Sequence, residues 1–288
     1  MAIREVLLAT CWTTAGDALP LPGKDLSPLS LRVRIEAARE AGFRGFGLLD
    51  CDLDKFLLNN SLQELKKILE DNGMEAIELE FLTGWFTTGD EKKASNILKQ
   101  KLFTAAEALG AHHIKIATDI TGGAWEKDPW AKELLKLGKE VESYGTKLAI
   151  EFMPFANVKD LATGLDLVNT VDHLKVGLMV DMWHIARGGT SLDELAKVPL
   201  HRIIGVELDD ADAVQIDDGY SDTIHRRRLC GEGDLPVVGM IQTLKKIGWT
   251  GPWGVEILSV EHRSLELHEA ARRAFNTTAE CFRIANAG

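Results

Sequence analysis

Short apolar segments of strand length alternate with helical patterns from one end of the sequence to the other. This alternation is typical of parallel βα units, in which each strand is followed by a helix that returns over the sheet. The 288 residues divided among eight units give 36 residues per unit, enough for a strand, a helix and two loops. We therefore predict an α/β fold, a single (β/α)8 TIM barrel, with one domain over residues 1–288. The predicted strands are residues 6–11, 45–49, 76–81, 113–118, 148–152, 176–181, 203–208 and 253–258.

The helical patterns that start at Ser30, Ser61 and Glu91 each end on a glycine. A glycine in this position adopts the left-handed conformation that ends many helices. No Pro/Ser-rich linker or low-complexity tract interrupts the chain, which agrees with a single domain.

Four of the predicted strands end with one acidic residue. In a TIM barrel the C-terminal ends of the strands meet at one mouth, so these side chains are expected to converge. Two unit charges about 4 Å apart repel by roughly 4 kcal/mol at an effective dielectric of about 20, so the cluster needs protons or a cation. Oxygen ligands suit Mg²⁺ or Mn²⁺, which predicts a metal site; a solvated acid or a helix N-cap is the alternative for any one residue. The four are Glu151 in LAIEF, Asp181 in GLMVD, Glu207 in IGVEL and Glu256 in WGVEI.

The residues two positions before these acids are expected to lie beneath them, because alternate residues of a strand share one face. Three of these four residues are small, which predicts free space under a ligand. They are Ala149, Met179, Gly205 and Gly254.

The net charge of −11, from 33 basic and 44 acidic residues, disfavours a polyanionic partner. We therefore expect a small polar, carbohydrate-like substrate and no nucleic acid. The sequence has no cleavage-site pattern and no apolar run near the roughly 18 residues of a membrane span, so we expect a cytoplasmic protein that does not bind a membrane. No CxxC pair is present, and reduced thiols are expected at Cys11, Cys51, Cys230 and Cys281.

Motifs near the predicted strand ends resemble those of the xylose-isomerase-like TIM barrels, a superfamily of sugar isomerases, epimerases and dehydratases that also contains the endonuclease IV branch. The resemblance spans nearly the whole chain and rests on IEFMP around Glu151, VDMWH at residues 180–184, GVELDD around Glu207, RRRLCGEGD at residues 226–234 and WGVEI around Glu256. It implies that one divalent metal is held by Glu151, Asp181, Glu207 and Glu256.

Glu207 departs from the family pattern, because the family more often has a neutral ligand at this position. A fourth carboxylate favours a hard cation, so Mn²⁺ and Mg²⁺ rank ahead of Zn²⁺. The alternative is that Glu207 pairs with an arginine and the metal has three protein ligands.

The resemblance also implies residues that act on the substrate. His184 matches the histidine of the family's DxxH motif, which lies near the substrate or a second cation; a capping or surface histidine is the alternative. Arg227 and Arg228 precede the GEGD turn, where the family places an arginine that binds a substrate oxygen or phosphate.

Further pocket candidates follow from their places near the ends of predicted strands. Glu80 lies near the end of residues 76–81, and Trp12 and Trp183 follow two other strands, where an indole ring can stack on a sugar. Ordinary packing is the alternative for each tryptophan, and exposure or an ion pair for Glu80. Gly47 stands where relatives often have a glutamate, which predicts a wide pocket. His113 opens its strand at the opposite end and is expected to be structural.

A divalent ion in such a site can chelate a carbonyl and a neighbouring hydroxyl and stabilise the enediolate formed when the carbon between them loses a proton. We expect Glu151 and Glu256 to be the acid and the base, with His184 as a third catalytic residue. This predicts an isomerase or epimerase of a keto sugar or sugar phosphate. Loss of a β-hydroxyl from the same enediolate would instead make the protein a lyase, such as a dehydratase of a keto-inositol, a dehydroshikimate or a 3-keto-glycoside.

Two other functional classes are weighed against these. An apurinic endonuclease needs several histidines for a multi-metal cluster and a basic face, whereas this sequence offers His184 alone near the site and a negative charge. A non-catalytic metal or sugar binder stays an alternative, because a fold can retain a site without its activity. We expect a homo-oligomer, either a dimer or a tetramer.

Overall fold

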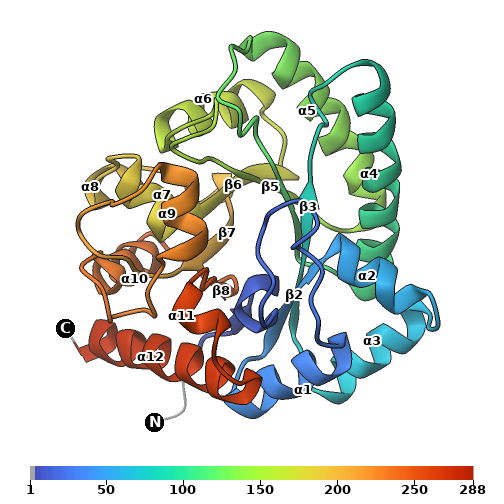
Figure 1. The fold of residues 1–288 in the computed structure, drawn as a ribbon. Coiled ribbons are helices and arrows are strands. Elements are labelled where there is room, and N and C mark those ends of the chain that lie inside the picture. The colour runs from blue at the N-terminus through green and yellow to red at the C-terminus, as the bar shows by residue number, and fades with distance from the viewer. Residues whose placement is uncertain (1–3, 288) are drawn as a thin grey trace.

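A computed structural model describes residues 4–287 and shows a closed barrel of eight parallel strands. The strands are β1 (Leu7–Ala9), β2 (Gly45–Leu49), β3 (Ala76–Leu82), β4 (His113–Ile116), β5 (Leu148–Glu151), β6 (Val176–Asp181), β7 (Ile203–Leu208) and β8 (Trp253–Val255). They pair in sequence order, and β8 pairs with β1 to close the barrel (Figure 1). The predicted (β/α)8 TIM barrel is confirmed.

The predicted strands at 45–49, 176–181 and 203–208 agree with β2, β6 and β7. Strands β1 and β8 are shorter than predicted, because the chain leaves the barrel early at these two places. After β1 it turns into the 3-10 helix η1 (Cys11–Thr14). Directly after β8, the Glu256 backbone N–H donates to the Leu208 carbonyl of β7 at 3.0 Å. The residues beyond these short strands therefore lie at the mouth of the barrel.

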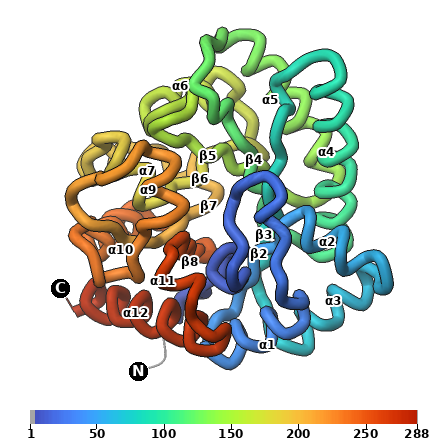
Figure 2. The backbone as a smooth tube through the Cα atoms, viewed as in Figure 1, coloured from blue at the N-terminus to red at the C-terminus, as the bar shows by residue number. Residues whose placement is uncertain are grey.

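The helices surround the barrel, and the last of them packs against the first (Figure 2). As predicted, α1 and α4 end on a left-handed glycine, Gly42 and Gly110 respectively. Helix α3 begins with a capping box, in which Ser61 and Glu64 each accept a hydrogen bond from the other's backbone N–H. The α-helices are α1 (Leu31–Ala41), α2 (Asp50–Leu57), α3 (Leu62–Asp71), α4 (Gly89–Leu109), α5 (Lys127–Val141), α6 (Leu161–Val171), α7 (Met182–Arg187), α8 (Leu192–Leu195), α9 (Gly219–His225), α10 (Val237–Lys246), α11 (Val260–Arg263) and α12 (Leu267–Ala287), and two more 3-10 helices are η2 (Glu142–Tyr144) and η3 (Leu200–Arg202).

The main hydrophobic core lies between the strands and the surrounding helices. Leu79 and Ile114 on the strands and Leu102 and Phe103 on α4 are among its buried members. Buried charged residues alternate with these apolar residues along the strands, as Glu78 and Glu80 do on β3 and Lys115 does on β4. Because alternate residues of a strand face opposite sides, the apolar residues pack against helices and the charged residues fill the barrel interior.

The space beneath the four acids is filled by protein, which corrects the prediction of free space under a ligand. A Cβ on Gly205 would clash with the end of the Met179 side chain. A Cβ on Gly254 would lie 2.8 Å from Cγ of Glu207. Ala149 packs with Met179 in a small buried cluster. The small residues therefore make room for neighbouring side chains rather than for a ligand.

Gly47 does not widen the pocket, which corrects a second prediction. A Cβ built on Gly47 would lie 2.6 Å from the backbone nitrogen of Cys11 and 2.9 Å from Cα of Thr10. Backbone atoms cannot rotate away as a side chain can. The glycine therefore allows β2 to approach the chain that follows β1.

Within residues 4–287, no helix combines the length and the apolarity that crossing a bilayer requires. The four cysteines are unpaired, as expected. Burial raises the pKa of the Cys11 and Cys230 thiols well above their usual value, which keeps both in the less reactive protonated form.

Replacing Gly47 with alanine tests this close approach. We expect Gly47→Ala to lower the free energy of unfolding by about 1–3 kcal/mol, because overpacking against backbone forces a local shift. Gly164→Ala is the control, since its Cβ would meet side chains rather than backbone, Leu178 at 3.1 Å and Phe152 at 3.5 Å, and the change favours helix α6. Urea unfolding measures both variants. Equal stability of Gly47→Ala and the wild type would show that β2 can move away from η1.

Candidate metal and substrate site

The four acids at the strand ends converge, as predicted. One carboxylate oxygen from each lies within 4.8 Å of the others, and all four residues are buried. Glu151 and Asp181 are the last residues of β5 and β6, Glu207 lies opposite Asp181 in the ladder between β6 and β7, and Glu256 follows β8. The parallel register thus places the four carboxylates at one mouth of the barrel. Their role as metal ligands stays a prediction.

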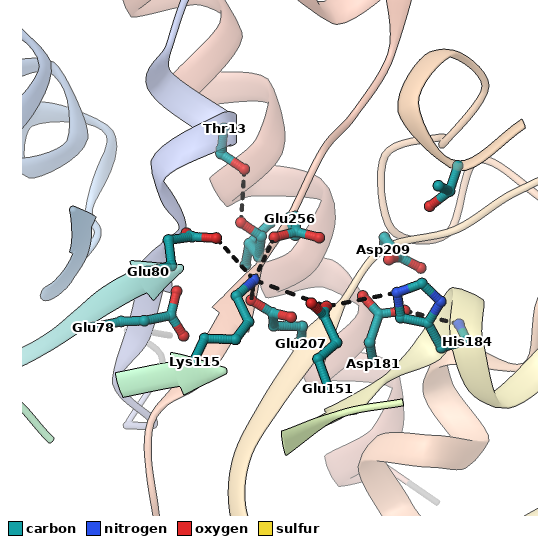
Figure 3. A network of polar contacts seen from close by, with 12 residues as sticks. Thr13, Glu78, Glu80, Lys115, Glu151, Asp181, His184, Glu207, Asp209 and Glu256 are labelled. Atoms are coloured by element: carbon teal, nitrogen blue, oxygen red, sulfur yellow. Dashed lines mark hydrogen bonds and ion pairs between the residues drawn. The ribbon is translucent and has the colours of Figure 1, made fainter. Parts of the chain in front are cut away.

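A buried lysine, which the sequence analysis missed, lies among these carboxylates. Lys115 extends from β4 into the barrel, and Figure 3 shows its ammonium surrounded by glutamates. Its Nζ lies 2.8 Å from Oε1 of Glu207, 2.9 Å from Oε1 of Glu256, 3.2 Å from Oε2 of Glu80 and 3.9 Å from Oε1 of Glu151. Glu207 therefore forms an ion pair, but its partner is a lysine and not the arginine that the alternative named. The one signal in the sequence was a lysine inside the apolar run HIKIA.

The carboxylates keep this lysine charged. Burial by itself lowers the pKa of Lys115, but Glu151, Glu207, Glu256 and Glu80 together outweigh burial and raise the pKa well above its usual value. The acids respond differently to the shared environment. Burial raises the pKa of Glu207 well above its usual value, and repulsion by Glu256 adds to it.

A second buried cation, Arg227, lies on the other side of the cluster. Its Nη1 lies 2.7 Å from Oδ2 of Asp181 and 3.1 Å from Oε2 of Glu256, and it also donates to Asp209. Burial opposes the ionisation of Asp181, but the attraction of Arg227 outweighs it and holds the pKa of Asp181 below its usual value. Nε and Nη2 of Arg227 donate to the Thr223 hydroxyl. Sequence analysis missed Asp209, which directly follows β7.

The charges of the cluster fit a bound cation. Lys115 and Arg227 are in ion-pair distance of six carboxylates, so acids exceed these two cations by four. Among the described residues, no group donates a hydrogen bond to Oε2 of Glu207, although this atom is buried. An unpaired buried carboxylate oxygen is costly unless a cation or proton satisfies it. The donor set therefore suits a hard divalent ion.

His184 lies beside this cluster at the start of α7. Its backbone N–H donates to Oδ1 of Asp181 at 2.8 Å, and its Nε2 lies 3.5 Å from Oε1 of Glu151. The side chain also forms a second group with Glu151 and Asp181 whose ligand atoms lie within 4.8 Å of one another. His184 is thus placed to contact either a metal or a substrate, and its catalytic role stays a prediction.

A cavity of about 620 Å³ opens above the cluster. Of the predicted substrate-binding residues, Trp12, Glu80 and Arg227 line it, together with the predicted catalytic residues Glu151, His184 and Glu256 and with Lys115.

Two predicted substrate-binding residues lie outside this cavity. Trp183 is fully buried, and its Nε1 donates to Oδ2 of Asp222 at 3.3 Å. Arg228 faces solvent and pairs with Asp212 at 3.1 Å, with 44% of its side chain exposed. Both predictions are corrected: neighbouring packing turns the Trp183 ring behind the site, and Arg228 points to the opposite side of the chain from Arg227.

His113 and Glu78 form a buried pair below the site. His113 Nε2 lies 2.7 Å from Oε2 of Glu78. Burial raises the pKa of Glu78 to about 7 and lowers that of His113 to about 3, so burial disfavours the charged form of each residue. The structural role expected for His113 agrees with this geometry.

Replacing Lys115 with methionine tests its role as the counter-ion of the cluster. We expect Lys115→Met to lower the free energy of unfolding by roughly 3–5 kcal/mol, because removing one partner leaves buried charges uncompensated. The control is Lys101→Met, whose lysine pairs with Asp50 and Asp54 but is 24% exposed, so a loss of no more than about 1 kcal/mol is expected. Denaturant unfolding in EDTA measures both. Equal losses would mean that Lys115 is not the main counter-ion.

Comparison with known proteins places the chain in a family. The model of the xylose isomerase-like TIM barrel family matches residues 35–281. Inosose isomerase from Halalkalibacterium halodurans is 25% identical over 236 residues, which cover 79% of this chain and 82% of that protein. The 3-dehydroshikimate dehydratase of Pseudomonas aeruginosa is 22% identical over 233 residues, which cover 80% of this chain but 36% of the longer relative.

Solved structures agree with this assignment. The crystal structure of IOLI protein with a zinc atom has a TM-score of 0.81 to this chain at 22% identity, and the match covers 97% of this chain and 99% of that one. The family match and the closed barrel lead to the same conclusion. This chain belongs to the xylose isomerase-like TIM barrel family.

Proposed function

We propose that this protein is a divalent-metal-dependent isomerase or epimerase of a keto sugar or a related cyclic polyol ketone. The observation that carries the proposal is the convergence of four buried carboxylates at a cavity that is large enough for such a substrate. The relative called inosose isomerase supports the reaction class.

The proposed metal ligands are Glu151, Asp181, Glu207 and Glu256. An all-carboxylate set favours Mn²⁺ or Mg²⁺, and the zinc atom of the similar IOLI protein supports a divalent ion in general. When bound, such an ion polarises a carbonyl and stabilises negative charge on neighbouring oxygens.

The proton transfers are assigned to Glu151 and Glu256. Both carboxylates line the cavity, and they reach it from β5 and from the end of β8, so they approach a substrate from different sides. One takes the proton from the carbon beside the carbonyl, and the other returns a proton. Return to the opposite face of the same carbon inverts it, and return to the neighbouring carbon moves the carbonyl.

Lys115 and His184 support these transfers. Lys115 holds Glu207 and Glu256 at hydrogen-bond distance, and its fixed positive charge also lines the cavity. His184 lies beside Glu151 and can exchange a proton with a substrate hydroxyl. A fixed donor in a site of low dielectric stabilises developing negative charge more strongly than water does.

A lyase on the same scaffold is the second candidate, and the relative called 3-dehydroshikimate dehydratase favours it. In a lyase, the first proton abstraction is the same, but the intermediate expels a β-hydroxyl instead of accepting a proton. His184 is placed to protonate that leaving hydroxyl.

Proton exchange tests the proposal and separates the two candidates. The Mn²⁺-loaded protein is incubated in D₂O with keto sugars and cyclic keto-polyols, and the products are analysed by NMR. Deuterium at carbon in an epimer or isomer is expected. An unsaturated product would identify a lyase. Absence of exchange with every compound, from a protein that also binds no divalent ion at about micromolar concentration, would refute the proposal.

Replacing Glu256 with glutamine tests the metal site directly. We expect Glu256→Gln to fold, to bind Mn²⁺ at least about 10-fold more weakly and to exchange deuterium about 10²-fold or more slowly, because a neutral amide attracts the cation less and cannot transfer the proton. Titration calorimetry and NMR measure the two effects. Glu261→Gln is the control, because Glu261 is 64% exposed on α11. Unchanged metal affinity of Glu256→Gln would remove Glu256 from the ligand set.

A further inference from the structure

The cavity has a charged floor and an apolar wall. Its charged floor is formed by residues on or next to the strands, such as Glu80, Lys115, Glu151 and Glu256. Beyond the strand ends the lining changes in character, because loops after β1, β3, β4 and β5 contribute apolar side chains. The loop members of this wall include Leu21, Phe86, Ile120, Met153 and Phe155, and Phe81 at the end of β3 adjoins them.

The segment that follows β1 forms a part of this wall that is held by hydrogen bonds. It contributes Leu21, flanked by two prolines that also line the cavity. The Tyr220 hydroxyl donates to the Pro20 carbonyl, which ties the segment to α9. Further along, the Ser27 hydroxyl donates to the Ala15 carbonyl at 2.9 Å. Hydrogen bonds therefore hold this segment of the wall in place.

This wall is larger than a polyol needs. Several of its side chains are only partly buried, and Ile120 is 49% exposed. Apolar surface that faces a cavity beside a polar site usually contacts an apolar part of the ligand. The cavity volume of about 620 Å³ corresponds to the volume of about 20 water molecules at roughly 30 Å³ each. This is more space than the twelve non-hydrogen atoms of a single polyol ring fill.

The charges of the lining disfavour a phosphate. Lys115 and Arg227 are the lysine and the arginine among the described lining residues, and both are occupied by carboxylates. Three further acids, Asp25, Asp50 and Asp119, line the cavity and are partly exposed. A phosphate group needs free guanidinium or ammonium donors and would meet acids here instead.

We propose that the substrate is an uncharged cyclic polyol ketone that carries an apolar, ring-sized substituent, as in a keto-glycoside with an aromatic aglycone. The polyol ring contacts the charged floor, and the substituent packs against the apolar wall. The inference rests on the proposed function in one respect, which is that the polar ring of the substrate is a polyol ketone. It narrows the predicted keto sugar or sugar phosphate to compounds without a phosphate.

Binding measurements test the inference without relying on turnover. Phenyl 3-keto-glucoside, methyl 3-keto-glucoside and fructose 6-phosphate are titrated into the Mn²⁺-loaded protein by calorimetry. We expect the phenyl compound to bind about 10- to 100-fold more tightly than the methyl compound, because one more ring is buried, and the phosphate to bind most weakly. Equal affinities for the two glycosides, tighter binding of the phosphate, or no binding of any probe would overturn the inference.

Variants of the wall give the matched comparison. Ile120→Asn and Leu21→Asn are expected to weaken binding of the phenyl compound about 10-fold and to leave the affinity for the methyl compound unchanged. The reason is that only the phenyl substituent loses a contact. Ile97→Asn is the control, since Ile97 is 74% exposed on α4 and lines a different surface groove. A phenyl affinity that none of the wall variants changes would overturn the inference. Failure of the proposed function is seen separately, as absence of deuterium exchange in a glycoside that binds.

Discussion

The arrangement of the site depends on the buried ammonium of Lys115. Carboxylates from β3, β5, β7 and the residue after β8 face the interior of the barrel, and each close pair would repel by roughly 4 kcal/mol at about 4 Å and an effective dielectric near 20. Lys115 lies 2.8–3.2 Å from Glu80, Glu207 and Glu256, so its charge offsets several repulsions at once. A cation held by the backbone of β4 therefore allows the barrel to keep acids at its centre.

Two cations divide these acids into overlapping groups. Lys115 contacts Glu207, Arg227 contacts Asp181, and Glu256 contacts both cations through different oxygens. This explains why a glutamate is tolerated at position 207, where the family more often has a neutral ligand. The additional negative charge of Glu207 on β7 is balanced by Lys115 on β4. The charge at position 207 can therefore be understood only together with the residue on β4.

Strands and loops contribute different properties to the cavity. The hydrogen-bonded ladder holds the charged groups at defined positions, which suits proton transfer, because a small displacement of a catalytic group is costly. The loops contribute the apolar wall around Leu21 and Ile120, and loop sequences can change without disturbing the barrel. In the proposed function, the strand ends supply the reacting groups and the loops select the substrate.

The sequence by itself determined the barrel and its acidic mouth, because strand-length apolar runs, helix-ending glycines and an acid at a strand end are local signals that parallel topology converts into one shared site. Only the tertiary structure decided which residues balance those acids. Lys115 is 92 residues from Glu207 and 141 from Glu256, so no local sequence pattern predicts these two ion pairs. The same holds for Trp183 and Arg228, whose places in the sequence suited a pocket but whose side chains point elsewhere. The direction of a side chain outside a strand is set by the packing of elements distant in sequence, and strand periodicity carries no information about it.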